Sequence, residues 1–440
     1  MTKFVLFPVL SLLFIAMLCA LAIVITGCTA SEYGFNIGVG KVDITPKGAV
    51  TLAGSPFPEE STTVDIPLYV KAMVISVGEQ KVAIVTLDTL KYPTELADLA
   101  LQQVEKETGI PAGNVTITSS HTHSGPLYPY YNGGLTGSIV EAVKSALRDL
   151  TPCKIGISNT EVTGISHNRR LLIKGEAWND WQVKSHTARY TFPAAGPIDP
   201  DLQVLAAVGK DGKYKAILWN YACHAAANSD NTISADYPGY VQNYIREQLR
   251  YDAMTLCLPG ACGDINPNNS VANVGDALGD GIVKSLGNLE FIAKPSIYVD
   301  ERIIQLPGRE NPVFKEAEIA EKWPATLETY RNVFDAMMAA AKPTYKTYLC
   351  GIRIGDDFAM VTNPDELFDE FGLNIKKSSP FKHTMVVEQT NGALGYVPTK
   401  KDFEVGGYET WFGEHSFLST GAGDTIQNES IDILKDLKSK

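Results

Sequence analysis

The stretch SHTHSGP (residues 120–126) follows directly on the extended run VTITS (115–119). Residues i and i+2 of a strand face the same side. If the strand continues through this stretch, the imidazoles of His121 and His123 lie together at a rigid strand end, where metal ligands keep their geometry. A hydrogen-bonded pair of histidines at a strand end is the alternative, since an H-x-H pattern alone does not separate the two.

Two further candidate ligands follow other apolar runs. His224 closes AILWNYAC (216–223), and Glu366 follows FAMVT (358–362) after a short NPD segment. A zinc site open for chemistry takes three ligands of the His, Asp and Glu types and keeps one position for water. Each residue also has an ordinary structural interpretation. His224 could be a buried histidine bonded to a backbone carbonyl, and Glu366 an acid in the first turn of a helix, where the helix dipole favours it.

Six short motifs in this order resemble the neutral/alkaline, non-lysosomal ceramidases. They are HTHSGP (121–126), NR (168–169), CH (223–224) followed by SADYPGY (234–240), GDINPN (263–268), NPDE (363–366), and GYVPT (395–399) with GYE (407–409). Each motif is short, but six in the right order are specific together. The resemblance covers the catalytic domain only, because no counterpart of the family's C-terminal immunoglobulin-like domain follows the last motif.

The resemblance implies a zinc amidase fold and a set of site residues. It places zinc on His121, His224, Glu366 and Tyr396, and it places His123, Arg169 and Tyr408 on the substrate side. Without the resemblance, Tyr396 is an aromatic residue of a strand, which is the commoner role of tyrosine.

One position departs from the family pattern. Asn266 stands where the ceramidases have a serine thought to act in catalysis. An asparagine is no practical nucleophile, but its amide can donate a hydrogen bond to an oxyanion. The substrate class implied is therefore a small-molecule or lipid N-acyl compound, of which ceramide is one example.

The chemistry expected is zinc-dependent hydrolysis of an amide bond. Zinc lowers the pKa of a bound water to about 7, so no serine nucleophile is needed. His123 or Asp264 would carry the proton, and Arg169 and Tyr408 would stabilise the oxyanion or fix the leaving group. Nickel or iron could occupy the same ligands.

Two other functions stay open. A metallohydrolase of another ester or phosphoester class would need a second metal, for which Asp88, Asp236 and Asp264 are candidates. Asp236 could instead orient a ligating histidine or open a helix. A non-catalytic lipoprotein that keeps the fold is the remaining alternative.

The N-terminus predicts a lipoprotein signal peptide over residues 1–27. An apolar run (4–26) is long enough to span a bilayer, and ITGC (25–28) looks like a lipobox. Residues 28–36 would be the lipidated Cys28 and its tether, which anchors an extracytoplasmic protein to the membrane of the cell envelope. An uncleaved signal anchor is the alternative. These residues are set apart from the fold.

Residues 37–440 are expected to form one large catalytic domain, because no linker or repeat interrupts them. The net charge of −12 disfavours a nucleic-acid partner, which needs a basic surface. Five cysteines remain beyond Cys19 and Cys28, an odd number that argues against a full disulfide framework. Cys257 and Cys262 could still pair in an oxidising compartment.

Alternating patterns predict an α/β fold with mixed sheets and packed helices. The predicted strands are 70–77, 81–87, 115–120, 202–208, 215–222, 254–258, 348–354, 358–362 and 384–388. The predicted helices are 94–108, 135–150, 240–249, 274–286, 314–338 and 366–376. In the first helix, Thr94 is the expected N-cap and Gly109 the expected stop.

Overall fold

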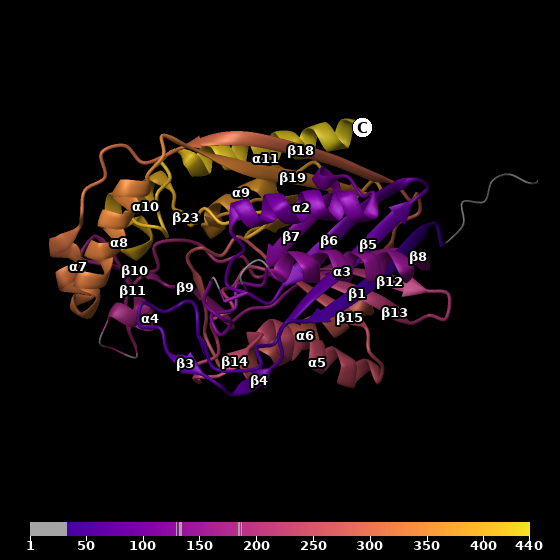
Figure 1. Ribbon diagram of the computed structural model, residues 1–440, viewed down its shortest axis with the longest axis horizontal. Coiled ribbons are helices and arrows are strands. Elements are labelled where there is room, and N and C mark those ends of the chain that lie inside the picture. Colours follow the sequence, from indigo (N-terminus) through magenta and orange to yellow (C-terminus); the bar gives the residue numbers. More distant parts are fainter. Residues whose placement is uncertain (1–32, 129, 132–133, 184, 186) are drawn as a thin grey trace, which may run out of the picture.

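Two β-sheets pack face to face, and helices cover the outer face of each (Figure 1). The structure is a computed structural model that describes residues 33–440 except 129, 132–133, 184 and 186. The predicted signal peptide and Cys28 lie outside these described residues. The layered arrangement confirms the predicted mixed α/β class.

The larger sheet follows the order β15-β13-β12-β8-β1-β5-β6-β7, with β17 paired to β8. Its strands are β1 (Phe35–Asp43), β5 (Tyr69–Val77), β6 (Gln80–Leu87), β7 (Val115–Ser119), β8 (Thr151–Glu161), β12 (Asp201–Gly209), β13 (Tyr214–Tyr221), β15 (Met254–Pro259) and β17 (Glu290–Phe291). The smaller sheet has the order β18-β19-β20-β22. Its strands are β18 (Ile297–Pro307), β19 (Thr344–Ile354), β20 (Phe358–Thr362) and β22 (His383–Val387).

The strands are buried on both faces, as β5 illustrates. Val70, Ala72 and Val74 pack against the helices on one side. Met73 and Ile75 pack on the other side against residues of the smaller sheet. This alternation follows from the two-residue period of a strand. It explains why these strands read as nearly continuous apolar runs.

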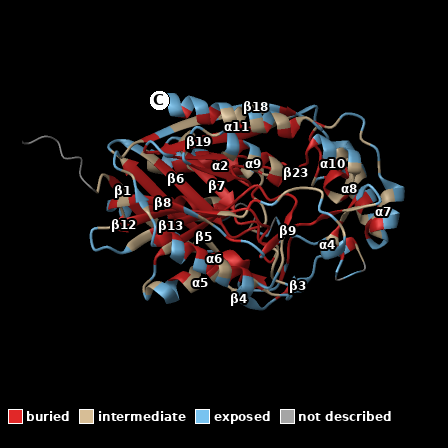
Figure 2. Cartoon of the chain, turned by 180° about the vertical axis from the view of Figure 1, so that it is seen from behind, coloured by how far each residue is buried: buried red, intermediate tan, exposed pale blue. Residues whose placement is uncertain are grey.

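Three sets of helices close the layers. The longer helices are α2 (Thr94–Thr108), α3 (Gly134–Arg148), α5 (Asp236–Leu249), α6 (Val271–Leu286), α9 (Asp369–Ser378) and α11 (Ala422–Ser439). Helices α2 and α3 cover one half of the larger sheet, and α5 and α6 cover the other. Helices α9 and α11 cover the smaller sheet. Figure 2 shows the buried strands between helices whose outward surfaces are exposed.

Shorter elements gather at one end of the molecule. The short helices are α4 (Ala188–Thr191), α7 (Glu316–Lys322) and α10 (Lys400–Val405), and the 14-residue helix α8 (Leu327–Ala340) lies with them. Short strand pairs are β2 (Val50–Thr51) with β3 (Glu60–Ser61), β4 (Val64–Ile66) with β14 (Ile233–Ser234), β9 (Ser166–Asn168) with β16 (Ile265–Pro267), β10 (Arg170–Ile173) with β11 (Glu176–Asn179), and β21 (Glu366–Leu367) with β23 (Tyr396–Val397). In Figure 1, α7, α8 and α10 lie beside β10 and β11, away from the main sheet.

Most neighbouring strands of the two large sheets are antiparallel, but three of their pairs are parallel: β6 with β7, β13 with β15, and β20 with β22. The carboxyl ends of two parallel strands meet at the same sheet edge, which is where ligands bind in α/β proteins. The loops after all three pairs carry the candidate site residues described below.

Several predicted elements need correction. Strand β1 begins at Phe35, inside the predicted 28–36 tether, and was not predicted. Its glycines weaken the strand pattern, yet they are needed, because a Cβ at Gly38 or Gly40 would lie 1.8 or 2.0 Å from backbone oxygens of α3. The predicted helix 314–338 is broken into α7 and α8 at Pro324, which cannot continue a helix.

Other corrections concern helix ends. The predicted N-cap of helix α2 is wrong, because Pro93 is the N-cap and Thr94 is the first helical residue. Gly109 ends the helix with a φ of 73°, as predicted. Helix α5 begins at Asp236, four residues before the predicted start. The predicted strands 348–354 and 358–362 are confirmed and form the antiparallel pair β19–β20.

The cysteines in the described part of the chain are free. Cys257 and Cys262 are both buried free thiols, so the pairing that the sequence left open is not formed. Within the described residues, no helix is long and apolar enough to cross a membrane.

Candidate metal centre and substrate site

The imidazole of His121 is held at a left-handed turn just after β7. The strand ends at Ser119, so it does not continue through the histidines as the sequence interpretation assumed. His121 has a φ of 63°, which is uncommon for a residue other than glycine. Its Nδ1 donates to the carbonyl oxygen of Leu90 at 2.8 Å. That bond fixes the ring and leaves Nε2 as the atom free to bind a ligand.

His121, His123 and His224 form one cluster despite the broken strand. The ring centroid of His121 lies 4.7 Å from that of His224 and 5.2 Å from that of His123. The backbone N–H of His123 donates to the carbonyl of Ala225 at 3.0 Å, which joins this turn to the loop after β13. One ring nitrogen from each histidine lies within 4.8 Å of the others, a spacing that suits a shared metal ion.

Glu366 brings a carboxylate to the cluster. Its Oε2 lies 3.4 Å from Nε2 of His121 and 3.5 Å from Nε2 of His224. Glu366 opens the two-residue strand β21, and helix α9 begins only at Asp369. The helix-start interpretation of Glu366 is therefore wrong, because pairing with β23 holds the backbone extended.

Three atoms of the cluster lack a protein partner. Nε2 of His121, Nε2 of His123 and Oε2 of Glu366 are buried without a hydrogen bond from the described residues. Such atoms are costly unless something satisfies them. His224 donates its Nδ1 to the carbonyl of Cys262 at 2.7 Å, as His121 does to Leu90. This is the usual arrangement of metal-ligating histidines, so the residues fit a metal ion.

The protonation states also suit metal binding. Burial and the charge of Arg169 lower the pKa of His224 to about 4. Burial and the neighbouring His121 hold the pKa of His123 well below its usual range. Burial raises the pKa of Glu366, but His121 and His224 together keep it well below its usual range. Neutral imidazoles and an ionised carboxylate are the forms that bind metals.

Tyr396 lies at the edge of the cluster. Strand β23 pairs in parallel with β21, so Tyr396 stands opposite Glu366. Its ring is 6.5 Å from that of His224, nearly parallel to it. Burial holds the pKa of the Tyr396 phenol well above its usual range, and the nearby charge of Arg169 offsets only part of this rise.

Arg169 is the cation closest to the histidines in the described site. Its Nη1 lies 3.2 Å from Nε2 of His224 and donates to Oδ1 of Asn266 at 3.2 Å. Its Nε donates to Glu409 at 2.8 Å, and the guanidinium lies over the ring of Trp181. The positive charge is therefore fixed beside the cluster and beside Asn266.

Glu409 is a site residue to which the sequence analysis gave no role. It is fully buried and accepts hydrogen bonds from Arg169, Arg170 and Asn179. Burial raises the pKa of Glu409, but the two arginines lower it to about 2. The sequence signal that could have indicated a buried acid is the pair of consecutive arginines, Arg169 and Arg170, because buried cations need a buried acid as partner.

Asp264 holds two chain segments together. Its Oδ1 accepts from the backbone N–H of Asp369 at 2.9 Å, and its Oδ2 accepts from Asn168 at 2.5 Å. Burial raises the pKa of Asp264 to about 6. Both oxygens are engaged away from the histidines, so His123 suits proton transfer better than Asp264 does.

Tyr408 belongs to an aromatic wall next to the cluster. Its ring stacks on His415 with centroids 4.9 Å apart and lies 5.6 Å from Tyr396. Trp181 contacts it edge-on at 6.1 Å. Tyr408 and Arg169 therefore both contact Trp181.

Glu388 connects two loops of the site and was not singled out from the sequence. Its Oε2 accepts from the backbone N–H groups of Cys262 and Leu367, each at 3.0 Å. The carbonyl of Cys262 holds His224, and Leu367 follows Glu366. Glu388 therefore connects the segment that positions His224 with the segment that positions Glu366. Burial raises its pKa well above the usual range.

The acids proposed for a second metal are not brought together. Asp88 accepts the backbone N–H of Tyr69. Asp236 accepts the N–H groups of Asn228 and Tyr237 at the start of α5, which is the helix-entry role. Across the described chain, the three-histidine cluster is the only group of three or more potential ligands.

Comparisons with known proteins concern the family and the fold of the chain. The family model of the neutral/alkaline non-lysosomal ceramidase N-terminal region matches residues 35–277, more than half of the chain. The fold is similar to neutral ceramidase from Pseudomonas aeruginosa, with a TM-score of 0.71, 17% identity, and coverage of 92% of this chain and 75% of that one. A ceramidase complexed with C2 gives a TM-score of 0.72, 16% identity and the same coverage. No curated protein matches the sequence.

The matched region contains the turn with His121 and His123, the Asn168-Arg169 pair and the loop of His224. Glu366, Tyr396 and Tyr408 lie beyond it, and the fold brings them to the same site. The chain therefore belongs to the neutral/alkaline non-lysosomal ceramidase family.

Proposed function

We propose that this protein is a zinc-dependent hydrolase of the amide bond in an N-acyl compound. The observation that carries the proposal is the convergence of His121, His123, His224 and Glu366, three of which present buried atoms without a protein partner. Membership of a ceramidase family supports amide hydrolysis, and a ceramide-like lipid is the first substrate to test.

Zinc would be held by His121, His224 and Glu366, with Tyr396 beside them as the fourth candidate. When bound there, zinc would supply a water of pKa about 7 for attack on the carbonyl. The nitrogen and oxygen ligands suit zinc, and they would also accept nickel or iron.

His123 is the residue best placed to take and return a proton. It is half-buried, its Nε2 lacks a partner among the described residues, and its low pKa keeps it neutral. A neutral imidazole can accept the proton of the attacking water and then donate it to the departing amine.

Arg169 would stabilise the negative charge that develops on the carbonyl oxygen. Its guanidinium is fixed by Glu409 and stays charged, so it needs no rearrangement during the reaction. Asn266 contributes an amide beside the same guanidinium. No serine nucleophile is required, which makes Asn266 compatible with hydrolysis.

We also propose that the protein acts at a membrane of the cell envelope, anchored through Cys28. The lipobox-like ITGC (25–28) supports this part of the proposal. A membrane anchor would bring the site close to amphiphilic N-acyl substrates.

The test is metal content together with amide hydrolysis. The purified protein should contain about one zinc ion per chain and hydrolyse N-acyl substrates. His121→Ala should lose both. A protein that binds no metal after incubation with zinc would contradict the proposal.

A further inference from the structure

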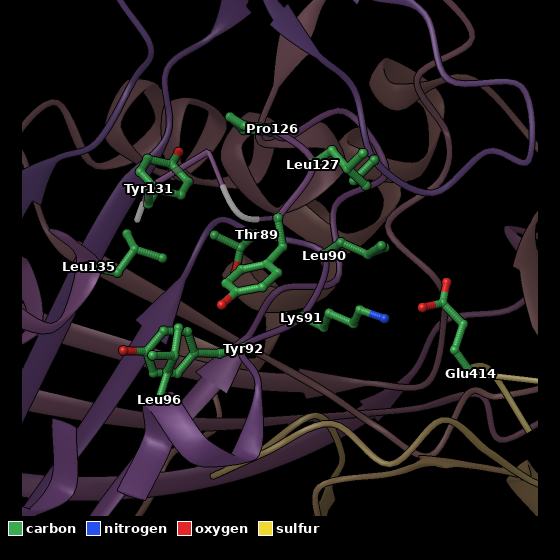
Figure 3. Close-up of a pocket in the computed structure, with 12 residues that line it drawn as sticks. Thr89, Leu90, Lys91, Tyr92, Leu96, Pro126, Leu127, Tyr131, Leu135 and Glu414 are labelled. Atoms are coloured by element: carbon green, nitrogen blue, oxygen red, sulfur yellow. The ribbon is translucent and has the colours of Figure 1, made fainter. Parts of the chain in front are cut away.

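An apolar cavity lies between the chain segments next to Leu90, Leu127 and Leu135 (Figure 3). Its volume is about 150 Å3, and its walls come from the segment before α2, from α2, from the segment after His123 and from the start of α3. The apolar lining includes Leu90, Tyr92, Leu96, Leu127, Tyr131 and Leu135. A largely apolar, concave cavity with a few polar groups is the usual form of a small-molecule site.

The cavity shares its backbone with the metal centre. Leu90 lines it, and the carbonyl oxygen of Leu90 is the group that holds Nδ1 of His121. Ala53 also lines it, and the adjoining Gly54 lies against His123, since a Cβ at Gly54 would lie 2.4 Å from Nδ1 of that ring. The cavity therefore borders the two segments that pack against the Nδ1 sides of His121 and His123.

The two ends of the cavity differ in polarity. Figure 3 shows Tyr131 and Leu135 at one end and Lys91 pointing toward Glu414 at the other. Glu414 precedes His415, whose ring stacks on Tyr408. The charged end is thus on the side of the aromatic wall, and the far end is apolar. This polarity suits a group with an apolar tail.

The volume limits what can enter. An apolar cavity of about 150 Å3 is large enough for a benzene-sized group. That size corresponds to a chain of about six carbons. The long acyl chain of a membrane lipid would extend beyond the walls.

We propose that this cavity is the acyl-specificity pocket of the enzyme and selects short N-acyl groups of about six carbons. The inference rests on the proposed amide hydrolase function, because it places the acyl side of the scissile bond in the cavity. Burial of each methylene should raise kcat/KM roughly fourfold until the cavity is full.

The experiment compares chain-length profiles in two matched variants. Leu96 is half-buried and lines the cavity, whereas Leu99, on the same helix, is 56% exposed and lies outside it. Leu96→Trp should fill the cavity, and Leu99→Trp is the control for a tryptophan on α2. The zinc-loaded full-length protein is assayed with N-acyl-4-nitroanilides from acetyl to hexadecanoyl, and thermal unfolding verifies that each variant is folded.

The wild type and Leu99→Trp should prefer hexanoyl over acetyl and gain nothing with longer chains. Leu96→Trp should lose about tenfold or more of the hexanoyl rate relative to acetyl, since the added ring occupies the cavity. A profile that rises steadily to hexadecanoyl would overturn the inference. So would a folded Leu96→Trp variant with the profile of the wild type.

Binding of the product carboxylate separates this inference from the proposed function. Butanoate, hexanoate and decanoate are titrated by calorimetry. If no anilide is hydrolysed but hexanoate binds the wild type and Leu99→Trp and not Leu96→Trp, the amide hydrolase function fails and the acyl pocket stands. If anilides are hydrolysed while hexanoate binds equally to all three proteins, the pocket fails and the function stands. If hexanoate binds to none of them and no anilide is hydrolysed, both fail.

Discussion

Oε2 of Glu366 lies 3.4 Å from Nε2 of His121, although the two residues follow strands of different sheets. His121 comes after β7 of the larger sheet, and Glu366 comes after β20 of the smaller one. The face-to-face packing of the two sheets therefore builds the centre. Loss of either side chain should leave the rest of the fold intact and remove a metal ligand.

The first prediction concerns the ligands. His224→Ala should reduce bound zinc from about one ion per chain to nearly none, because it removes one of the converging ring nitrogens. His383→Ala is the control, since His383 is a buried histidine of β22 outside the cluster. Elemental analysis of both purified variants measures the difference. Full zinc content in a folded His224→Ala variant would remove His224 from the ligand set.

Substitution of His123 should show whether this residue binds the metal or transfers a proton. If it acts in proton transfer, His123→Ala keeps about one zinc ion per chain but loses about 10²–10⁴-fold in kcat, the usual contribution of general acid–base catalysis. If it is a ligand, metal content falls together with activity. Metal analysis and steady-state kinetics on one preparation distinguish the two roles.

Glu409 should contribute strongly to stability. Glu409→Gln removes the buried carboxylate that Arg169 and Arg170 share, which should cost about 3–5 kcal/mol. Glu404→Gln changes an exposed acid of the nearby helix α10 and should have little effect. Urea unfolding of both variants measures the free energies. Equal stabilities would show that the buried ion pairs contribute nothing net.

The same acid predicts the direction of a pH effect. The pKa of Glu409 falls from 4.5 to about 2 in the folded protein. A lowered pKa stabilises the fold at pH values above 4.5, and that stabilisation is lost as the pH falls toward 2. The difference in Tm between wild type and Glu409→Gln should therefore narrow below about pH 4.5. A difference that stays constant would show that the Glu409 pKa is not lowered.

Glu388 should act as a positioning residue. Glu388→Ala removes the acceptor shared by Cys262 and Leu367, so zinc affinity should fall about 10–100-fold. Glu388→Gln keeps the shape and one acceptor oxygen, and it should restore most of the affinity. Competition with a zinc chelator measures both values. If the zinc affinity of Glu388→Ala equals that of the wild type, Glu388 has only a packing role.

The predicted lipid anchor at Cys28 lies outside the described residues and can be tested directly. Wild-type protein should partition into the detergent phase of a cloud-point extraction, and mass spectrometry should find a lipid-modified Cys28 at the new N-terminus. Cys28→Ser should remain unprocessed. An unmodified Cys28 in wild-type protein would rule out the lipoprotein.

The sequence predicted the strands well where they are buried on both faces. Runs such as those of β5, β6, β13 and β20 are continuous and apolar, so local composition was enough. It missed β8 and β18. It also missed β1, whose glycines allow close contact with α3. That requirement is tertiary and leaves no local pattern.

For the site, the sequence by itself determined which residue types were available: the H-x-H pair, His224, Glu366 and the order of the family motifs. Only the tertiary structure decided how they meet. The left-handed turn at His121, the extended backbone at Glu366 and the convergence of loops from two sheets all depend on contacts between distant segments. The partners Glu409 and Glu388 emerged for the same reason, because a buried charge is recognised by what surrounds it and not by its neighbours in the chain.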